Sequence, residues 1–432
     1  MRFDEEIPYQ MIKPNFTGFS RMAEIEQRFP DDFVADVEAA VRGEISRLTL
    51  PDLRGARIAI TAGSRGIPNF GETVAAIGRL LREKGAQPFV VPAMGSHGNG
   101  DAQGQVEVLA ACGMTETSLG MPIHSSMETV LLGTSESGAQ IYCDKTAFEA
   151  DGIVVCGRVK PHTDFRGPIE SGLCKMMAVG LGNHEGAVAF HKTGRGEMSE
   201  RLQSAARLFL AKTRVLFGVA LIDNAYHRTK RIEAVPPGEI LSREPDLLVE
   251  AAAAMPRLFV DEMDALIVDQ YGKEISGAGM DPNITGRFLF APHLRYPGYP
   301  YAKKIAILRL TEASHGNAAG LGIADYVSRS FAQRLDLGVT YTNSLSSTLS
   351  MGKIPMVMNN DLDTIYAAAS CCGKPDVKEA RIVRIKNTLE IERILVSENL
   401  LDELKEKPNV RVVREPEELR FDADGNLEGL PR

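Results

Sequence analysis

Short apolar runs alternate with amphipathic segments along most of the chain, and this alternation predicts an α/β protein. An apolar run at 57–63 is followed by a loop and an amphipathic helix at 72–86, and a run at 88–95 by a loop and a helix at 105–114. Strand, loop, helix and strand in this order are typical of a parallel sheet. Because ligands bind beyond the carboxyl ends of parallel strands, the two loops are candidate binding loops.

The same pattern continues to the C-terminus and predicts two domains. Further strands are expected at 128–133, 139–144, 152–157, 215–223, 264–272, 303–310, 337–343, 354–359, 381–387, 393–398 and 409–413. Helices are expected at 29–48, 197–213, 243–255, 361–372 and 399–407. With 432 residues, the chain exceeds the size at which one hydrophobic core keeps growing. We therefore expect two α/β domains with largely parallel sheets, residues 1–265 and 266–432, and an active-site cleft between them.

Composition narrows the functional classes. The formal net charge of −8 opposes a nucleic-acid partner, which requires a basic face. No apolar run approaches the roughly 20 residues that span a bilayer, so no membrane partner is expected. The acidic start MRFDEEIPYQ does not resemble a signal peptide, and we expect a cytoplasmic protein. The six cysteines form no C-x-x-C pair, which indicates reduced, mostly buried thiols.

Potential chemistry is most concentrated between Gly157 and Lys192. Three of the eight histidines lie there, His162, His184 and His191. Lys175 lies in the apolar sequence LCKMMAVG, and a buried ammonium is costly unless it is paired or used as a neutral nucleophile.

The sequence HEGAVAFH in this stretch suggests zinc only weakly. It separates His184 from His191 by two helical turns, whereas the zinc-protease motif H-E-x-x-H needs one turn. Gly182 and Gly186 also argue against a continuous helix through His184.

Two other loops at strand ends carry reactive side chains. In the first, Ser64 and Arg65 are suited to holding an anion. In the second, His97 lies among glycines and small residues and is a candidate general base. His162 directly follows a predicted strand, so we expect it to face the same cleft as His97.

These three loops together resemble the nickel-dependent lactate racemase family. Members carry an arginine–proline loop after the first strand, then a G-x-H loop, a P-H element, a lysine, and a histidine sixteen residues after that lysine. The matching elements here are Ser64-Arg65-Gly66-Ile67-Pro68, Gly95-Ser96-His97, Pro161-His162, Lys175 and His191. Order and rough spacing hold for all five, and they cover about the first half of the chain.

The resemblance implies a cofactor and a role for each residue. The family uses a nickel-pincer nucleotide, pyridinium-3,5-bisthiocarboxylic acid mononucleotide nickel, which a thioamide links to the lysine that matches Lys175. Nickel is bound by two sulfurs and a carbon of the cofactor and by the histidine that matches His191. His97 and His162 match the acid–base pair. The remaining cofactor contacts are assigned to Ser64, Arg65, Ser171 and Gly172.

The implied reaction inverts a carbon that bears a hydroxyl and a carboxylate. One histidine removes the hydroxyl proton while hydride leaves the α-carbon, and the other histidine serves the opposite enantiomer. Small 2-hydroxy acids and cofactor biosynthesis proteins are the expected partners, and a homo-oligomer is left open.

Departures from the family pattern point away from lactate. Ala62 stands where members often have aspartate, and Gly172-Leu173-Cys174 replaces Gly-Gly-Arg before the lysine. In the second half, Asp281-Pro282-Asn283 is the nearest match to an Asp-Gln-Asn segment, and Arg287 stands in place of a lysine. We therefore expect a 2-hydroxy acid other than lactate, with Arg287, Arg166 and Asn283 as candidate substrate contacts.

Two alternatives stay open at this point. One is a zinc metallohydrolase whose ligands are His162, His184 and His191. The other is a non-catalytic binding homologue that never receives the cofactor.

Overall fold

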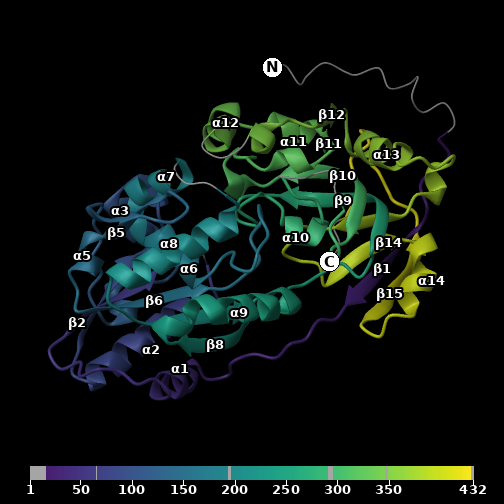
Figure 1. Ribbon diagram of the computed structural model, residues 1–432. Coiled ribbons are helices and arrows are strands. Elements are labelled where there is room, and N and C mark those ends of the chain that lie inside the picture. Colours follow the sequence, from purple (N-terminus) through teal and green to yellow (C-terminus); the bar gives the residue numbers. More distant parts are fainter. Residues whose placement is uncertain (1–15, 65, 193–195, 290–294, 346–348, 430–432) are drawn as a thin grey trace. The chain divides into compact units, whose positions relative to one another are not determined.

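The computed structural model describes residues 16–64, 66–192, 196–289, 295–345 and 349–429 (Figure 1). These residues form two compact units. Unit 1 comprises the described residues of 1–29 and 256–432, and unit 2 comprises those of 30–255. This division differs from the predicted one at 265, because residues 16–29 join the C-terminal unit and the second crossing comes at 255–256. Each unit is a mixed α/β fold, and the predicted fold class of two α/β units with largely parallel sheets is confirmed.

Five strands form the main sheet of unit 2, in the order β3-β2-β6-β7-β8. Four of them run parallel, and β8 is antiparallel to β7. The strands are β2 (Arg57–Ala62), β3 (Gln87–Pro92), β6 (Gly152–Arg158), β7 (Val215–Asp223) and β8 (Thr229–Val235). A separate hairpin consists of β4 (Thr129–Thr134) and β5 (Gln140–Asp144). Only β8 among these strands was not predicted.

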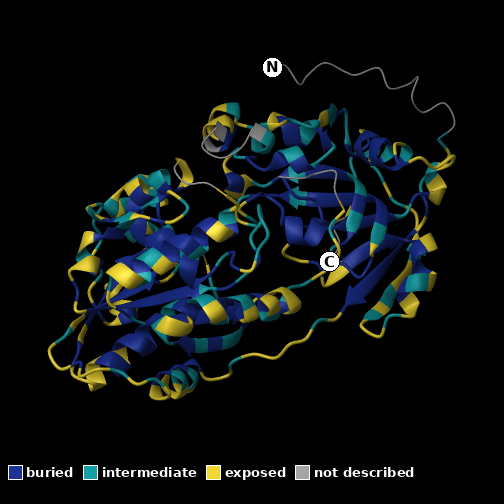
Figure 2. Cartoon of the chain, in the orientation of Figure 1, coloured by how far each residue is buried: buried dark blue, intermediate teal, exposed yellow. Residues whose placement is uncertain are grey.

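Apolar side chains cover both faces of this sheet. In β2, Ile58 and Ile60 pack with apolar residues of α1 to α4, whereas Ala59 faces a second apolar cluster with α6, α8 and α9. Figure 2 shows the resulting buried strands. Coverage of both faces is what a parallel sheet requires. The helices of unit 2 are α1 (Val37–Ser46), α2 (Phe70–Glu83), α3 (Ala102–Ala111), α4 (Glu116–Leu119), α5 (Lys145–Phe148), α6 (Leu173–Ala178), α7 (Asn183–Lys192), α8 (Met198–Lys212) and α9 (Ile240–Ala254).

Unit 1 contains an eight-stranded sheet in the order β12-β11-β10-β9-β13-β14-β1-β15. Strands β12 to β13 in this order run parallel, and β14, β1 and β15 continue the sheet with antiparallel pairing. The strands are β1 (Met22–Gln27), β9 (Glu262–Tyr271), β10 (Tyr301–Leu310), β11 (Tyr326–Ser328), β12 (Met356–Met358), β13 (Ile382–Ile385), β14 (Arg393–Ser397) and β15 (Val410–Glu417). Its helices are α10 (Pro282–Thr285), α11 (Arg329–Gln333), α12 (Leu337–Leu345), α13 (Asp361–Ser370) and α14 (Leu401–Lys405).

Strand β1 explains why the N-terminal segment belongs to unit 1. It lies between β14 and β15, and Ala23 and Ile25 are fully buried. The intervening Glu24 is also buried and pairs with Arg414 of β15 at 2.9 Å. Charged residues at alternate positions predict a strand that is exposed on one face. The pairing with β14 and β15 shows that β1 is instead an internal strand of the sheet.

Two local predictions were wrong. The predicted strand at 337–343 is helix α12, which begins where the Asp336 side chain accepts the Val339 N–H at 3.0 Å. The hydrogen bond at the start of the helix outweighs the preference of the β-branched residues for a strand. The predicted break near Gly186 is also absent, since α7 runs continuously from Asn183. A Cβ at Gly186 would lie 3.0 Å from the Tyr142 side chain, so the glycine serves close packing against β5. No helix in the described parts of the chain is long and apolar enough to cross a membrane.

Candidate functional site

The carboxyl ends of β2, β3 and β6 carry the loops that the sequence analysis singled out. The first loop begins at Gly63, where a Cβ would lie 3.6 Å from the Met176 side chain of α6. The second is tied to the segment after α6, because the Gly95 N–H donates to the Gly180 carbonyl at 3.1 Å. All three loops therefore meet around α6, the helix that carries Lys175.

Positive φ angles shape the loop after β3. Gly95, Gly98 and Gly100 have φ near +61° to +66°, and Asn99 has φ of 59°. Glycine adopts this conformation at little cost, so the glycine-rich sequence is explained by the turn itself. The turn leaves His97 exposed, and its Nδ1 makes a short hydrogen bond with the Ser64 hydroxyl. Two of the predicted site residues, on different loops, are thus in contact. Arg65, the third residue predicted in these two loops, lies outside the described residues.

A buried carboxylate organises the loop that follows β6. Glu170 accepts the main-chain N–H of His162 at 2.6 Å and that of Gly167 at 3.0 Å. Arg166 donates from Nη1 to the Phe165 carbonyl at 2.7 Å and to Glu170 at 3.3 Å. Burial raises the pKa of the Glu170 carboxyl, and these donors oppose the rise. The Arg166 contacts lie within the loop, so its role toward a substrate stays a prediction.

His162 and Lys175 form the central contact of the site. The Nε2 atom of His162 lies 2.7 Å from the Nζ atom of Lys175. Its other nitrogen, Nδ1, accepts the main-chain N–H of Asp164 at 3.0 Å. The ring also stacks on Phe165, with centroids 4.3 Å apart. Both ring nitrogens and one ring face are therefore fixed by neighbours.

The turn before Lys175 rests on a carboxyl that the sequence analysis did not find. Glu244 of α9 is 1% exposed and accepts the main-chain N–H of Cys174 at 2.9 Å. Burial raises its pKa to about 7, and the hydrogen bonds from residues 173 and 174 partly offset that effect. A Cβ on Gly172 would lie 2.3 Å from a Glu244 oxygen, so a side chain at residue 172 would displace the Glu244 carboxyl. Ser171 is held by main-chain pairing with Lys160, at 3.0 and 3.2 Å.

Helix α7 places the other two histidines at its opposite ends. His184, in the first turn, packs against Gly100, where a Cβ would lie 2.8 Å from its Nδ1. His191, in the last turn, is exposed. The protein around its ring lowers the pKa of His191, and the positive charges of Lys175 and Arg201 lower it further. A lowered pKa favours the neutral imidazole, the form that a metal binds.

The candidate substrate residues Asn283 and Arg287 belong to unit 1. Asn283 donates from its side chain to Asp281 at 2.8 Å. Arg287 is buried and donates to three main-chain carbonyls at 2.7 to 3.1 Å and to the Asp325 carboxylate. These contacts give Arg287 a structural role in unit 1, and its contact with substrate stays a prediction.

No group of three or more His, Cys, Asp or Glu side chains is arranged to hold a metal within the described residues. His162, a ligand in the zinc alternative, has a contact at each ring nitrogen in this structure, with the Asp164 N–H and with Lys175. The nickel-pincer nucleotide that the resemblance implies would supply three of the metal's donors itself, and His191 would be the one protein ligand that it needs. The Lys175 amine, which lies beside the His162 imidazole, and the second histidine, His191, fit this cofactor.

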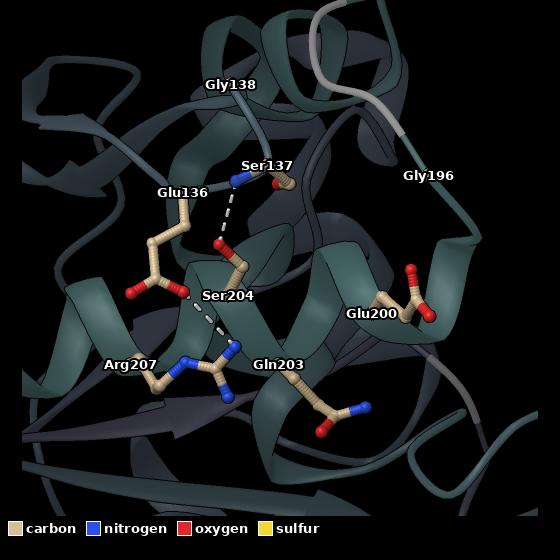
Figure 3. Close-up of a pocket in the computed structure, with 8 residues that line it drawn as sticks. All are labelled: Glu136, Ser137, Gly138, Gly196, Glu200, Gln203, Ser204 and Arg207. Atoms are coloured by element: carbon tan, nitrogen blue, oxygen red, sulfur yellow. Dashed lines mark hydrogen bonds and ion pairs between the residues drawn. The ribbon is translucent and has the colours of Figure 1, made fainter.

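An open depression of about 770 Å³ lies elsewhere in unit 2, between the β4–β5 turn and α8 (Figure 3). Its wall includes Ser137, whose N–H donates to Ser204 at 3.1 Å, and the exposed ion pair of Arg207 with Glu136 at 3.5 Å. None of the predicted site residues lines it. We therefore assign the chemistry to the loops around α6.

No family model matches the chain, and no protein of curated function matches it. Among solved structures, the chain is similar to the lactate racemase apoprotein from Thermoanaerobacterium thermosaccharolyticum, with 14% sequence identity and a TM-score of 0.45. The similarity covers 88% of this chain and 96% of that chain.

Proposed function

We propose that the protein is a racemase or epimerase of a 2-hydroxy acid that works by reversible hydride transfer on a lysine-tethered nickel-pincer nucleotide. The observation that carries the proposal is the contact between His162 and Lys175. Five ordered elements of the sequence resemble the nickel-dependent lactate racemases, and two of those elements meet in this contact. The hydrogen bond between Ser64 and His97 supports it by joining two more loops at the same edge of the sheet.

Two residues of this chain would hold the cofactor. Lys175 is the attachment point, and the six-residue helix α6 that carries it is anchored at its start by Glu244. His191 would ligate nickel, because its lowered pKa keeps the imidazole lone pair available. When bound, such a cofactor would supply a reversible hydride acceptor for the α-carbon of the substrate.

Two histidines would move the proton of the substrate hydroxyl. Ser64 orients the His97 ring through Nδ1, which assigns proton transfer to its Nε2. The Asp164 N–H donates to Nδ1 of His162, so the neutral ring carries its proton on Nε2 and would begin as the proton donor to the substrate oxygen. Two bases are needed because the two enantiomers present their hydroxyls in different directions.

The substrate class follows from the reaction and from the departures in the sequence. A carboxylate beside the reacting carbon needs a cation, and Arg166 and Arg65 are candidates on the loops of unit 2. Because Ala62 and Gly172-Leu173-Cys174 differ from the lactate racemase pattern, we propose a 2-hydroxy acid other than lactate. Proteins that make the nucleotide would be obligatory partners, since the chain receives it preformed.

Protein purified from its native host tests the proposal. Peptide mass analysis should place a nucleotide-sized adduct on Lys175, and metal analysis should find about one nickel per chain. The His191→Ala variant from the same host should keep the adduct and lose nickel, whereas the matched His184→Ala variant should keep both. Unmodified Lys175 in native-host protein would refute the proposal, and bound zinc would restore the hydrolase alternative.

The same native-host preparation tests the substrate. It should interconvert enantiomers or epimers of malate, 2-hydroxyglutarate or aldonates, with hydrogen retained at the α-carbon in deuterated water. Turnover of lactate alone would refute the substrate assignment and leave the reaction type standing.

A further inference from the structure

The loop that follows β6 uses most of its polar groups to hold its own shape. Glu170 accepts the main-chain N–H groups of His162 and Gly167. Arg166 donates to main-chain carbonyls of the loop and to Glu170. The ring of His162 accepts the main-chain N–H of Asp164 at 3.0 Å. The side chain of Asp164 takes no part in this network.

The Asp164 carboxyl is half-buried and has no hydrogen-bond or ion-pair partner among the described residues. Burial raises its pKa, and the positive charge of Lys175 partly offsets that rise, so the carboxyl lies within electrostatic range of the proposed attachment point. The loop needs only a main-chain N–H from residue 164, which any residue except proline supplies. Because a half-buried carboxyl without a partner costs free energy, the fold alone does not explain an aspartate here.

Thr163, between His162 and Asp164, shows the same pattern. Its hydroxyl is half-buried and has no hydrogen-bond partner within the described parts of the chain. Two adjacent polar side chains beside a candidate acid–base histidine are therefore unused by the fold. A carboxylate accepts hydrogen bonds from hydroxyls, and a threonine hydroxyl both donates and accepts them. This pair is suited to a ligand that carries several hydroxyl groups.

The loop is poorly suited to a second carboxylate on the substrate. Its only lysine or arginine is Arg166, which pairs with Glu170 at 3.3 Å and donates to the Phe165 carbonyl at 2.7 Å. Asp164 would repel a carboxylate placed beside it, and facing like charges disfavour a complex. A thioamide at Lys175 would also remove the positive charge that acts on Asp164, because a thioamide nitrogen is not protonated.

We propose that Asp164 determines substrate specificity and that the substrate is a polyhydroxylated 2-hydroxy monoacid, an aldonate, whose hydroxyls beyond the reacting carbon bond to Asp164 and Thr163. The inference rests on the proposed function for the reaction at the α-carbon and adds the substrate class. A 2-hydroxy diacid would meet the like charge of Asp164. A 2-hydroxy acid with an alkyl side chain would leave both polar groups without a partner. Asp164 thus selects for hydroxyls and against a second carboxylate.

Three four-carbon acids test the proposal, because they differ only beyond the reacting carbon. Trihydroxybutanoate carries hydroxyls there, malate carries a carboxylate, and 2-hydroxybutanoate carries neither. Each acid is supplied as an equilibrated mixture of its stereoisomers at the reacting carbon, so that turnover does not change the ligand. Isothermal titration calorimetry gives the dissociation constants for native-host protein, and the adduct on Lys175 and the nickel content are measured in the same preparation.

Wild-type protein should bind trihydroxybutanoate at least about tenfold more tightly than 2-hydroxybutanoate, because hydrogen bonds to a charged group are the strong ones. Malate should bind more weakly than 2-hydroxybutanoate. Asp164→Asn keeps the main-chain N–H and the size of the side chain and removes its charge. The variant should weaken trihydroxybutanoate binding about tenfold and strengthen malate binding about tenfold, with 2-hydroxybutanoate changed by less than about twofold.

Opposite changes for two ligands separate a role in specificity from a structural role, because a loosened loop would weaken the binding of all three acids. The matched control is Glu136→Gln, which removes an exposed carboxylate from the β4–β5 turn and should change each affinity by less than about twofold.

Three results would overturn the proposal: wild-type protein that does not bind trihydroxybutanoate, wild-type protein that does not prefer it to the other two acids, or an Asp164→Asn variant with unchanged preference. A preparation that carries the adduct and nickel and fails this test refutes the substrate class alone. A preparation without the adduct refutes the proposed function instead.

Discussion

Replacing Glu244 by glutamine should remove a pH-dependent component of the stability of unit 2. The Glu244 carboxyl is 1% exposed and supports the turn that precedes Lys175 through the Cys174 N–H. Burial raises its pKa in the folded protein to about 7, from an ordinary value of 4.5. A raised folded pKa means that the folded state binds the proton more tightly than the unfolded state. The stabilisation is therefore fully present below pH 4.5 and is lost as the pH rises through 7.

The magnitude follows from the two pKa values. Between pH 5 and pH 8, this one group should reduce the free energy of unfolding by about 2.5 kcal/mol, mostly between pH 5 and pH 7. Glutamine does not titrate and lacks this component. It also places a buried N–H₂ where the Glu244 Oε1 atom has no hydrogen-bond partner among the described residues, which adds a pH-independent cost of about 1 to 3 kcal/mol. The decisive quantity is therefore the change with pH of the difference between variant and wild type.

Amide hydrogen exchange measures this quantity for unit 2 alone. Peptides from β6 and β7 report the opening free energy of the unit 2 core at pH 5, 6, 7 and 8, without assuming that the whole chain unfolds in one step. The matched control is Glu250→Gln, on the same helix, where Glu250 is partly exposed and pairs with Arg231 at 2.9 Å. A difference between Glu244→Gln and wild type that stays constant from pH 5 to pH 8 would refute the reasoning, as would an equal slope in the control.

Two further predictions concern packing around the site and in unit 1. Gly172→Ala should destabilise unit 2 by about 2 to 3 kcal/mol and reduce the cofactor content of native-host protein, because its Cβ would lie 2.3 Å from a Glu244 oxygen. The control Gly238→Ala, where a Cβ meets nothing within 4 Å, should change stability by less than about 0.5 kcal/mol; equal effects in denaturant titration would contradict this account. Arg287→Gln should destabilise unit 1 by about 3 kcal/mol, because it breaks a partly buried ion pair with Asp325 and leaves buried carbonyls unpaired. A raised KM with unchanged hydrogen exchange in β9 and β10 would instead favour the substrate contact predicted from the sequence.

Local patterns were sufficient to predict most of the elements. The strands β2, β3, β6 and β7 are short apolar runs between turn residues, and burial on both faces makes that pattern strong. Strand β1 was missed because it carries glutamates whose arginine partners lie almost 400 residues away, at Arg411 and Arg414. Helix α12 was missed because its β-branched sequence favours a strand, and the start at Asp336 was not recognised.

The sequence identifies the candidate side chains of the site more readily than it identifies the residues that hold them in place. His97, His162 and Lys175 stand out in the sequence because reactive side chains lie among glycines or apolar residues at strand ends. Glu244 lies 70 residues from the main-chain N–H that it accepts, in a helix that reads as ordinarily amphipathic. The sequence did contain one indication of Glu244. Gly172 lies at the start of an apolar helix, and a glycine at such a position indicates that another residue packs closely against the main chain.

The support of the site is made largely by main-chain N–H groups, and this has a consequence for its chemistry. Glu170 accepts a hydrogen bond from the main-chain N–H of His162, and Glu244 accepts one from that of Cys174. The ring of His162 accepts one from the N–H of Asp164. Main-chain donors are present whatever the side chain, so the loop geometry depends on two buried carboxyls and one imidazole. Residues that face the ligand are then free to vary with the substrate while the turn keeps its shape. Such an arrangement would let the chain keep the five ordered elements of the resemblance while it departs from the family pattern at Ala62 and at Pro282.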